Sequence, residues 1–97
     1  MPTVKTAAAW LREEDWPRWQ TIDTEVWTYA EWLAKANEAI VLLEQRGVLI
    51  EKVVVEPDAF FAWCKRKRVS IEPKRRAEFA AAELRRRTLR RQRLFRP

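Results

Sequence analysis

Residues 28–55 read TYAEWLAKANEAIVLLEQRGVLIEKVVV, and this stretch decides the class of fold. In its first part apolar residues recur at helical spacing, which predicts an amphipathic helix over about residues 29–46. The last part, residues 48–55, is dense in β-branched side chains and predicts a strand. A strong helix followed at once by a strand favours a chain that mixes α and β structure.

The boundaries of these two elements carry signals of their own. Thr28 and Glu31 fit a capping box, in which the Thr hydroxyl accepts from a helical N–H and the Glu carboxylate reaches back to the N–H of Thr28. Gly47 suits the left-handed residue that follows many helices. Pro57 ends the strand, because proline cannot donate to a sheet.

The predicted strand needs a partner, because its backbone N–H and C=O groups cannot be left unpaired. No second segment has an equally strong strand pattern. We expect the 48–55 strand to pair either with a weak strand near residues 20–26 or with the same strand of a second copy. The second arrangement would make the protein a homodimer.

Further helices are expected on both sides of this stretch. Residues 7–20 predict one kinked helix or two short ones, because Pro17 interrupts the helical bonding. Pro57 and Pro73 each suit the first turn of a helix. The expected fold is mainly α, a small bundle of about four helices with one short strand near 48–55.

Charge divides the chain into an acidic and a basic part. Residues 1–63 hold 6 Lys and Arg against 11 Asp and Glu, a formal charge of −5. Residues 64–97 hold 14 against 3, a formal charge of +11. We expect one compact domain over residues 1–84 and a basic, flexible tail over residues 85–97. Such asymmetry indicates an acidic body with a basic arm that meets an anion.

The chain has few of the residue types that catalytic sites commonly use, since it has no His, one Cys and one Gly. It lacks the commonest general base, the glycines of a phosphate-binding loop and the ligands of the usual zinc site. We therefore expect no enzyme activity, no cofactor and no metal. Cys64 is expected in the core, and the carboxylates of Glu13–Asp15 on a solvated helix face. No apolar stretch is long enough to span a membrane, and we expect a cytoplasmic protein.

The basic arm is the first feature that can carry a function. Guanidinium groups suit phosphate and carboxylate, and a polyanion bound there would release counterions. We expect a small non-enzymatic module that binds nucleic acid through its phosphates with little sequence choice; a merely solubilising face is the other interpretation of these charges. The candidate contact residues are Lys65, Arg66, Lys67, Arg68, Lys74, Arg75, Arg76, Arg86, Arg87, Arg90, Arg91 and Arg93.

The tryptophans are the second feature, and most of them are expected in the core. Trp16 and Trp19 flank Pro17 and are expected to be partly exposed, where a protein partner could use them. They support an alternative function as a protein-interaction module or an accessory or neutralising subunit. In that case the Trp-rich acidic half docks a protein, or the basic arm meets an acidic protein surface.

The order of elements over about residues 48–90, a strand followed by two helices, resembles in outline the ribbon-helix-helix repressors. In that family one strand from each of two chains pairs with the other and contacts DNA. Here only Glu51 and Lys52 interrupt the aliphatic residues of the strand, and the basic residues lie on the helices. The resemblance therefore implies a paired strand but transfers no site residue.

Overall fold

The computed structural model describes residues 5–22 and 28–94. Within these residues the chain forms two strands and four α-helices, with a short 3-10 turn before the first helix. The elements are β1 (Lys5–Trp10), the 3-10 turn η1 (Glu13–Asp15), α1 (Trp16–Ile22), α2 (Tyr29–Gln45), β2 (Leu49–Val54), α3 (Pro57–Lys67) and α4 (Pro73–Leu94). The predicted class, mainly α with a small strand component, is confirmed.

The two strands form a parallel sheet, with Lys5 opposite Leu49 and Trp10 opposite Val54. β2 thus has a partner within its own chain. The expectation that it must pair with a weak strand near residues 20–26, or with a second copy, is therefore wrong; residues 23–26 of that weak strand lie outside the described residues. The outline shared with the ribbon-helix-helix repressors fails at the same point, because the strand does not need a second chain. The helix expected over residues 7–20 is also wrong up to Arg12, because residues 7–10 are strand and residues 11–12 are not helical.

The physical reason lies in the alanines of β1. Alanine has the highest helix propensity, but propensity is a weak signal that tertiary contacts override. β2 has to satisfy its backbone groups, and β1 is the segment that reaches it. The methyl groups of Ala7 and Ala9 also allow α4 to lie close to the strand, where both residues pack against the core.

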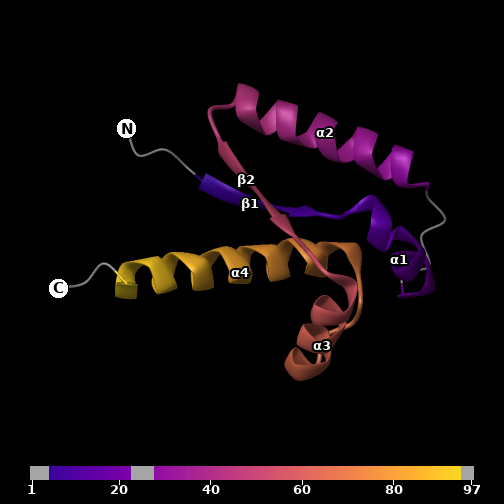
Figure 1. Ribbon diagram of the computed structural model, residues 1–97. Helices are drawn as coiled ribbons and strands as arrows, with labels where there is room; N and C mark the ends of the chain where they lie inside the picture. The colour runs from indigo at the N-terminus through magenta and orange to yellow at the C-terminus, as the bar shows by residue number, and fades with distance from the viewer. Residues whose placement is uncertain (1–4, 23–27, 95–97) are drawn as a thin grey trace.

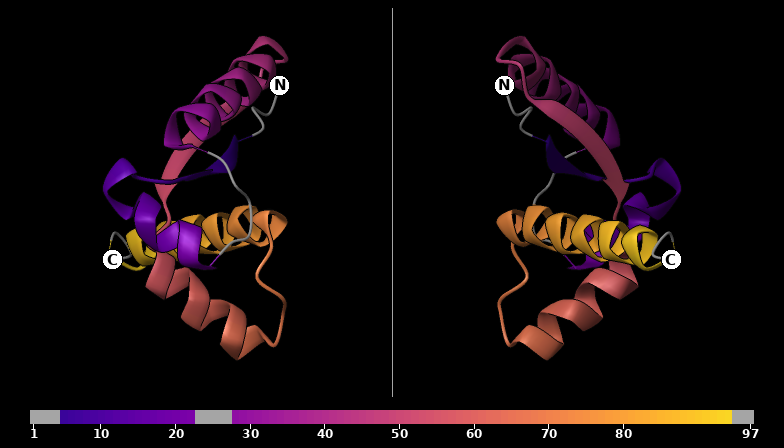
Figure 2. Two further views of the ribbon diagram at one scale, coloured as in Figure 1. Left: turned by 90° about the vertical axis from the view of Figure 1, so that its right-hand side faces the viewer. Right: turned by 90° about the vertical axis from the view of Figure 1, so that its left-hand side faces the viewer.

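The sheet lies between helices. Figures 1 and 2 show α2 on one face, α4 on the other, and α3 beyond α4 on the side away from α2. Alternate residues of β1 point to these two layers, as in any strand. Trp10 contacts Trp32 of α2 at 5.3 Å between ring centroids, whereas Ala9 packs against the core on the α4 side.

The buried core lies between the sheet and the helices α1, α3 and α4. Its fully buried described residues are Leu11, Trp19, Val53, Val55, Phe60, Cys64, Phe79 and Ala80. The Phe60 ring lies 5.6 Å from that of Trp19 and 5.9 Å from that of Phe79, measured between centroids. Each buried aromatic ring removes roughly 150–250 Å² from water, so three rings supply much of this small core.

Helix α2 begins and ends as its sequence predicts. The Thr28 hydroxyl accepts from the N–H of Glu31 at 3.1 Å, while the Glu31 carboxylate accepts from that hydroxyl rather than from the N–H of Thr28. Gly47 has φ +83°, and its N–H donates to Glu44 O at 3.0 Å. The N–H of Val48 donates to Leu43 O at 3.1 Å, which completes a Schellman motif.

The α2 layer is packed less tightly than the core. None of its residues is fully buried, although Tyr29 and Trp32 join Trp10 and Trp16 in a cluster of aromatic rings. Tyr29 Oη also donates to Leu11 O at 3.1 Å. These contacts anchor the start of α2, while its last turns expose apolar side chains to solvent.

Helix α3 ends at an unusual residue. Arg68 has φ 57°, in the left-handed region that favours glycine, and it is the one described residue other than glycine with positive φ. The N–H of Arg68 donates to Lys65 O and that of Val69 to Cys64 O, so this end is also a Schellman motif. The chain turns here into α4, which continues as one helix to Leu94.

Helix α4 runs across residue 84, where the sequence predicts that the compact domain ends and the flexible tail begins. Residues 85–94 are helical, which follows from the high helix propensity of arginine and leucine. The side chains described from Arg85 to Gln92 are all exposed. The compact domain over 1–84 with a separate tail stays a prediction, but the first part of that tail extends the last helix of the body.

Candidate nucleic-acid interface

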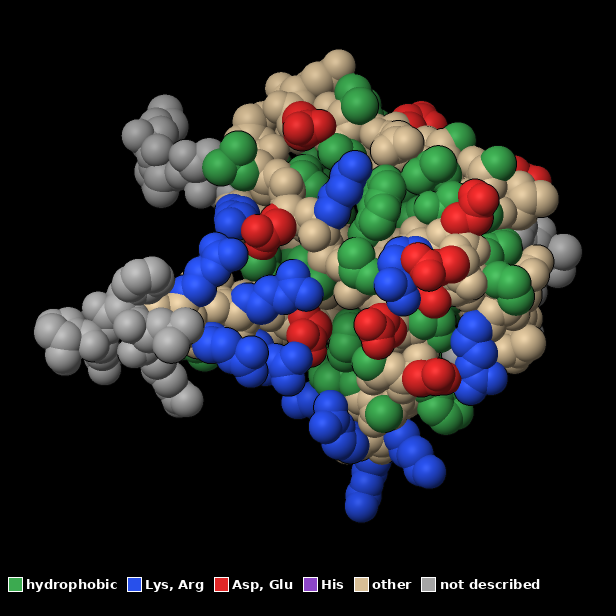
Figure 3. Space-filling view, in the orientation of Figure 1, with side chains coloured by type: hydrophobic (Ala, Val, Ile, Leu, Met, Phe, Trp, Pro, Cys, Tyr) green, Lys and Arg blue, Asp and Glu red, His purple; other side chains and the backbone are tan. Residues whose placement is uncertain are grey.

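The turn between α3 and α4 brings the basic segments of the chain together. In Figure 3 Lys and Arg side chains gather along the C-terminal half of α4 and at the end of α3, while the rest of this face mixes hydrophobic, acidic and a few further basic side chains. The two segments are separated in sequence by the connector and the first turns of α4. The fold therefore places the positive charge on one part of the surface.

A notch between α3 and α4 is the best-defined site on this surface. Its cavity of about 430 Å³ is lined by Trp63, Arg66, Lys67, Ala82, Glu83 and Arg86. Trp63 lies one helical turn before Arg66 and Lys67, which places the three on one side of α3. Arg86 follows Ala82 by one turn of α4, so these two residues also lie on one side of their helix. A cavity of this size admits a phosphate or a nucleotide base.

The charges in the notch differ in how far they are neutralised. Arg86 Nη2 lies 2.7 Å from Glu83 Oε2, so this pair is close to neutral. Arg66 and Lys67 are exposed and form no ion pair or hydrogen bond with the described residues. They are the cations best placed to meet an external anion.

Trp63 gives the notch an aromatic floor. Its ring packs edge-on against Phe79 at 5.6 Å and lies nearly parallel to Phe60, with 6.5 Å between centroids. The ring is partly exposed, and its position is fixed by the core residues behind it. Trp63 is not among the contact residues predicted from the sequence. Its helical spacing from Arg66 and Lys67 is the signal that could have placed it beside them.

The basic residues at the start of α4 serve the fold. Arg75 Nη1 lies 3.0 Å from Glu78 Oε2, its Nε lies 3.9 Å from Glu72 Oε2, and its side chain is only 24% exposed. The Arg76 guanidinium lies over the Trp19 ring at 5.6 Å. These two candidates are engaged within the protein, so the basic arm predicted from the sequence is interrupted at the first turn of α4.

Glu72 reduces the charge at this end further. The Ser70 hydroxyl donates to its carboxylate at 2.5 Å and, with the nearby Lys74 ammonium, keeps the pKa of Glu72 below its usual value. Lys74 Nζ lies 3.9 Å from the same carboxylate. Lys74 is therefore partly neutralised although it is exposed.

The remaining candidates are accessible. Lys65 and Arg68 lie at the exposed end of α3, and Arg87, Arg90 and Arg91 lie on the exposed half of α4. Arg93 is part of α4, but its side chain lies outside the described residues. The structure thus brings Arg66 and Lys67 of α3 together with Arg86 of α4, while Arg87, Arg90 and Arg91 are exposed further along the same helix.

Of the two tryptophans predicted to be partly exposed, Trp16 is partly exposed and Trp19 is buried. Trp19 is 2% exposed and packs on Phe60, so its expected exposure is wrong. Pro17 lies in the first turn of α1, and this helix turns Trp19 inward to the core. Trp16 is partly exposed and lies 5.5 Å from the Tyr29 ring. A role for Trp16 in a protein contact stays a prediction.

Two features considered for chemistry are structural. Cys64 is buried, and this burial raises the pKa of its thiol, with Arg75 opposing the shift. In the acidic turn, Arg12 Nε lies 2.9 Å from Asp15 Oδ2 and 3.8 Å from Glu14 Oε1. Among the described residues no cluster of His, Cys, Asp or Glu could hold a metal ion. No helix in the same residues is long and apolar enough to cross a membrane.

Comparison with models of protein families gives no match. Curated proteins and solved structures give none either.

Proposed function

We propose that this protein is a non-enzymatic module that associates with nucleic acid through its phosphates. The observation that carries the proposal is the α3–α4 notch, where Arg66 and Lys67 lie beside the ring of Trp63 and have no ion-pair partner among residues 5–22 and 28–94. Arg87, Arg90 and Arg91 add exposed positive charge further along α4. The helices hold this arrangement in place before a ligand binds.

A polyanion suits this surface better than a small anion does. The exposed cations lie on two helices, so one phosphate cannot contact them all, whereas a nucleic-acid backbone offers regularly spaced phosphates. The Trp63 ring can add stacking with an unpaired base, which is tolerant of sequence. Binding is therefore expected to depend on charge and to show little sequence choice. The reduced, buried Cys64 fits a site of action in the cytoplasm.

The proposal is tested by fluorescence anisotropy with labelled random duplex DNA and single-stranded RNA over a series of salt concentrations. Each phosphate contact contributes about 0.7–0.9 to the slope of log affinity against log salt. The double variant Arg66→Gln with Lys67→Gln should lower this slope by about 1.4–1.8 if both residues contact phosphate.

The matched control is Lys35→Gln with Arg46→Gln, which removes the same formal charge from exposed positions of α2 and its C-terminal cap. Its salt slope should equal that of the unchanged protein. If neither nucleic acid binds at low salt, or if both double variants weaken binding equally, the notch is not a phosphate site and the proposal fails.

A further inference from the structure

Exposed hydrophobic side chains gather at one end of the molecule. The large hydrophobic side chains most exposed among the described residues are Val41 (50%), Leu42 (51%), Leu49 (55%) and Leu89 (59%). They lie in the last turns of α2, at the start of β2 and in the C-terminal half of α4. Figure 1 places these three segments at the same end of the molecule, at the left of the view, with α2 and α4 on opposite faces of the sheet. Such a grouping marks an interaction surface.

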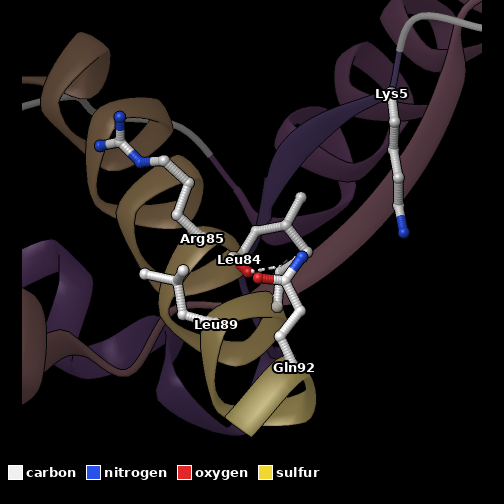
Figure 4. A pocket seen from close by; sticks show the side chains of 6 residues that line it. Lys5, Leu84, Arg85, Leu89 and Gln92 are labelled. Atoms are coloured by element: carbon white, nitrogen blue, oxygen red, sulfur yellow. Dashed lines mark hydrogen bonds between the residues drawn. The ribbon is translucent and has the colours of Figure 1, made fainter. Parts of the chain in front are cut away.

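A hollow accompanies Leu89 on α4. Its volume is about 330 Å³, and it is lined by Lys5, Leu84, Arg85, Thr88, Leu89 and Gln92 (Figure 4). The Thr88 hydroxyl donates to Leu84 O at 3.0 Å, so this polar group of the lining is already paired within α4. Arg86 and Arg90, on the notch side, follow a different row of the helix from Arg85 and Leu89. The two faces of α4 are therefore distinct.

Charge decides what can cover this hollow. Residues 85–92 hold five arginines and no acidic residue. A symmetric contact of α4 with α4 of a second copy would bring these arginines together and be repelled. The occupant must therefore combine exposed apolar side chains with carboxylates.

The chain itself carries such a surface. Val41 and Leu42 are half exposed near the end of α2, and the carboxylates of Glu38 and Glu44 lie beside them on exposed positions of the same helix. Neither Glu38 nor Glu44 forms an ion pair or hydrogen bond through its side chain within the described residues. This end of α2 is complementary to the hollow in both polarity and charge.

We propose that two copies of the chain form a dimer in which the end of α2 of each copy docks into the α4 hollow of the other. Because the end of α2 and the C-terminal half of α4 lie at the same end of the molecule, a two-fold axis there can make the two contacts together. The association then closes as a dimer and does not continue as a filament. The notch faces of the two α4 helices are left outside these contacts.

The first test is sedimentation velocity of the full chain, without nucleic acid, from about 1 μM to about 500 μM. We expect a concentration-dependent monomer–dimer equilibrium. Leu89→Glu and Leu42→Glu should each raise the dissociation constant at least about tenfold, because each places a polar charge in an apolar contact. Phe61→Glu, at a side chain 42% exposed on α3, is the control and should leave the equilibrium unchanged.

The second test exchanges the charges between the two surfaces. Variant A carries Glu38→Arg and Glu44→Arg, and variant B carries Arg85→Glu and Gln92→Glu. Each variant alone should be monomeric, because its altered surface repels the unaltered one. An equimolar mixture should dimerise, since each contact then joins opposite charges again.

Three outcomes overturn the proposal. The unchanged protein could stay monomeric over the whole range, the dimer could survive Leu42→Glu, or the mixture of A and B could fail to associate. Circular dichroism of each variant shows whether it is folded, and the exposed positions of all the substitutions make loss of the fold the least expected result. Nucleic-acid binding of the same variants is scored separately, so failure of the dimer leaves the proposed function open to its own test.

Discussion

At the scale of single residues, the two left-handed positions show how local chemistry ends a helix. Gly47 follows α2 and Arg68 follows α3. Each donates one hydrogen bond of a Schellman motif, and the next residue, Val48 or Val69, donates the other. Glycine reaches this conformation without strain, whereas a residue with a Cβ atom is penalised there. Arg68 therefore keeps a positive charge beside the notch at some expense of stability.

A reciprocal pair of substitutions measures this effect. Gly47→Ala should lower the free energy of unfolding by roughly 1 kcal/mol, since no atom lies within 4 Å of the added methyl and only the backbone angle opposes it. Arg68→Gly should raise the free energy of unfolding by a similar amount, roughly 1 kcal/mol, while nucleic-acid affinity falls. Urea unfolding of both variants is the measurement. Equal effects of the same sign would show that the left-handed turns do not limit stability.

Residue-scale signals also mark what the sequence could predict. The cap at Thr28 and the turn at Gly47 depend on neighbours within a few positions, and both were found where the pattern placed them. The left-handed Arg68 was not predictable, because nothing in its type favours that conformation. The engagement of Arg76 was equally hidden, since Trp19 comes from another helix.

At the scale of elements, β1 is the part of the fold that local reasoning missed. Its alanines favour a helix when they are considered alone, and only the parallel partner β2 turns the segment into a strand. Helices α2 and α3 were predictable because their apolar stripes and caps are local. The cations of the notch could be predicted, because they come from clusters of Lys and Arg in the sequence. The place of the Trp63 ring could not, because it depends on how α3 packs against Phe79.

Substitution of Ala8 distinguishes the strand from the helix that its sequence suggests. Ala8 lines a cavity of about 240 Å³ between β1 and α2. Ala8→Val should raise the free energy of unfolding by roughly 0.5–1 kcal/mol, because a β-branched residue suits a strand and its methyl groups fill space. In a helix the same change would lower stability. Thermal unfolding decides between the two.

The control for this substitution lies across the sheet. Ala80 is fully buried in α4, so Ala80→Val should overpack the core and lower the free energy of unfolding by about 1–3 kcal/mol. If Ala8→Val were equally destabilising, the space beside β1 would not be available to a larger side chain.

At the scale of the whole molecule, charge and core are separated. The core joins β1, β2, α1, α3 and the first half of α4, whereas the arginines of the second half of α4 lie outside it. Substitutions of these exposed arginines are therefore expected to leave the fold unchanged. The split in charge was visible in the sequence, but its rigid helical form was not, because a run of arginines equally fits a flexible tail.

Truncation after Thr88 tests this separation. The shortened chain keeps one turn of helix beyond Leu84, which packs against the core, and loses only side chains that are exposed or lie outside the described residues. Its free energy of unfolding should change by less than about 0.5 kcal/mol, while the salt slope of nucleic-acid binding falls. The measurement belongs at low micromolar concentration, where Leu89 has no second copy to contact. Loss of cooperative unfolding would place the end of α4 within the folding unit.

The parallel pairing of β1 with β2 also has a consequence in time. A growing chain makes β1 first, but its partner begins only at Leu49, and the residues that bury the sheet, Phe60 and Phe79, follow later still. Helix α2 can form from local contacts, whereas the sheet must wait for a long loop to close. We therefore expect β1 to stay unpaired during synthesis and to join the fold late, as the step that sets the folding rate.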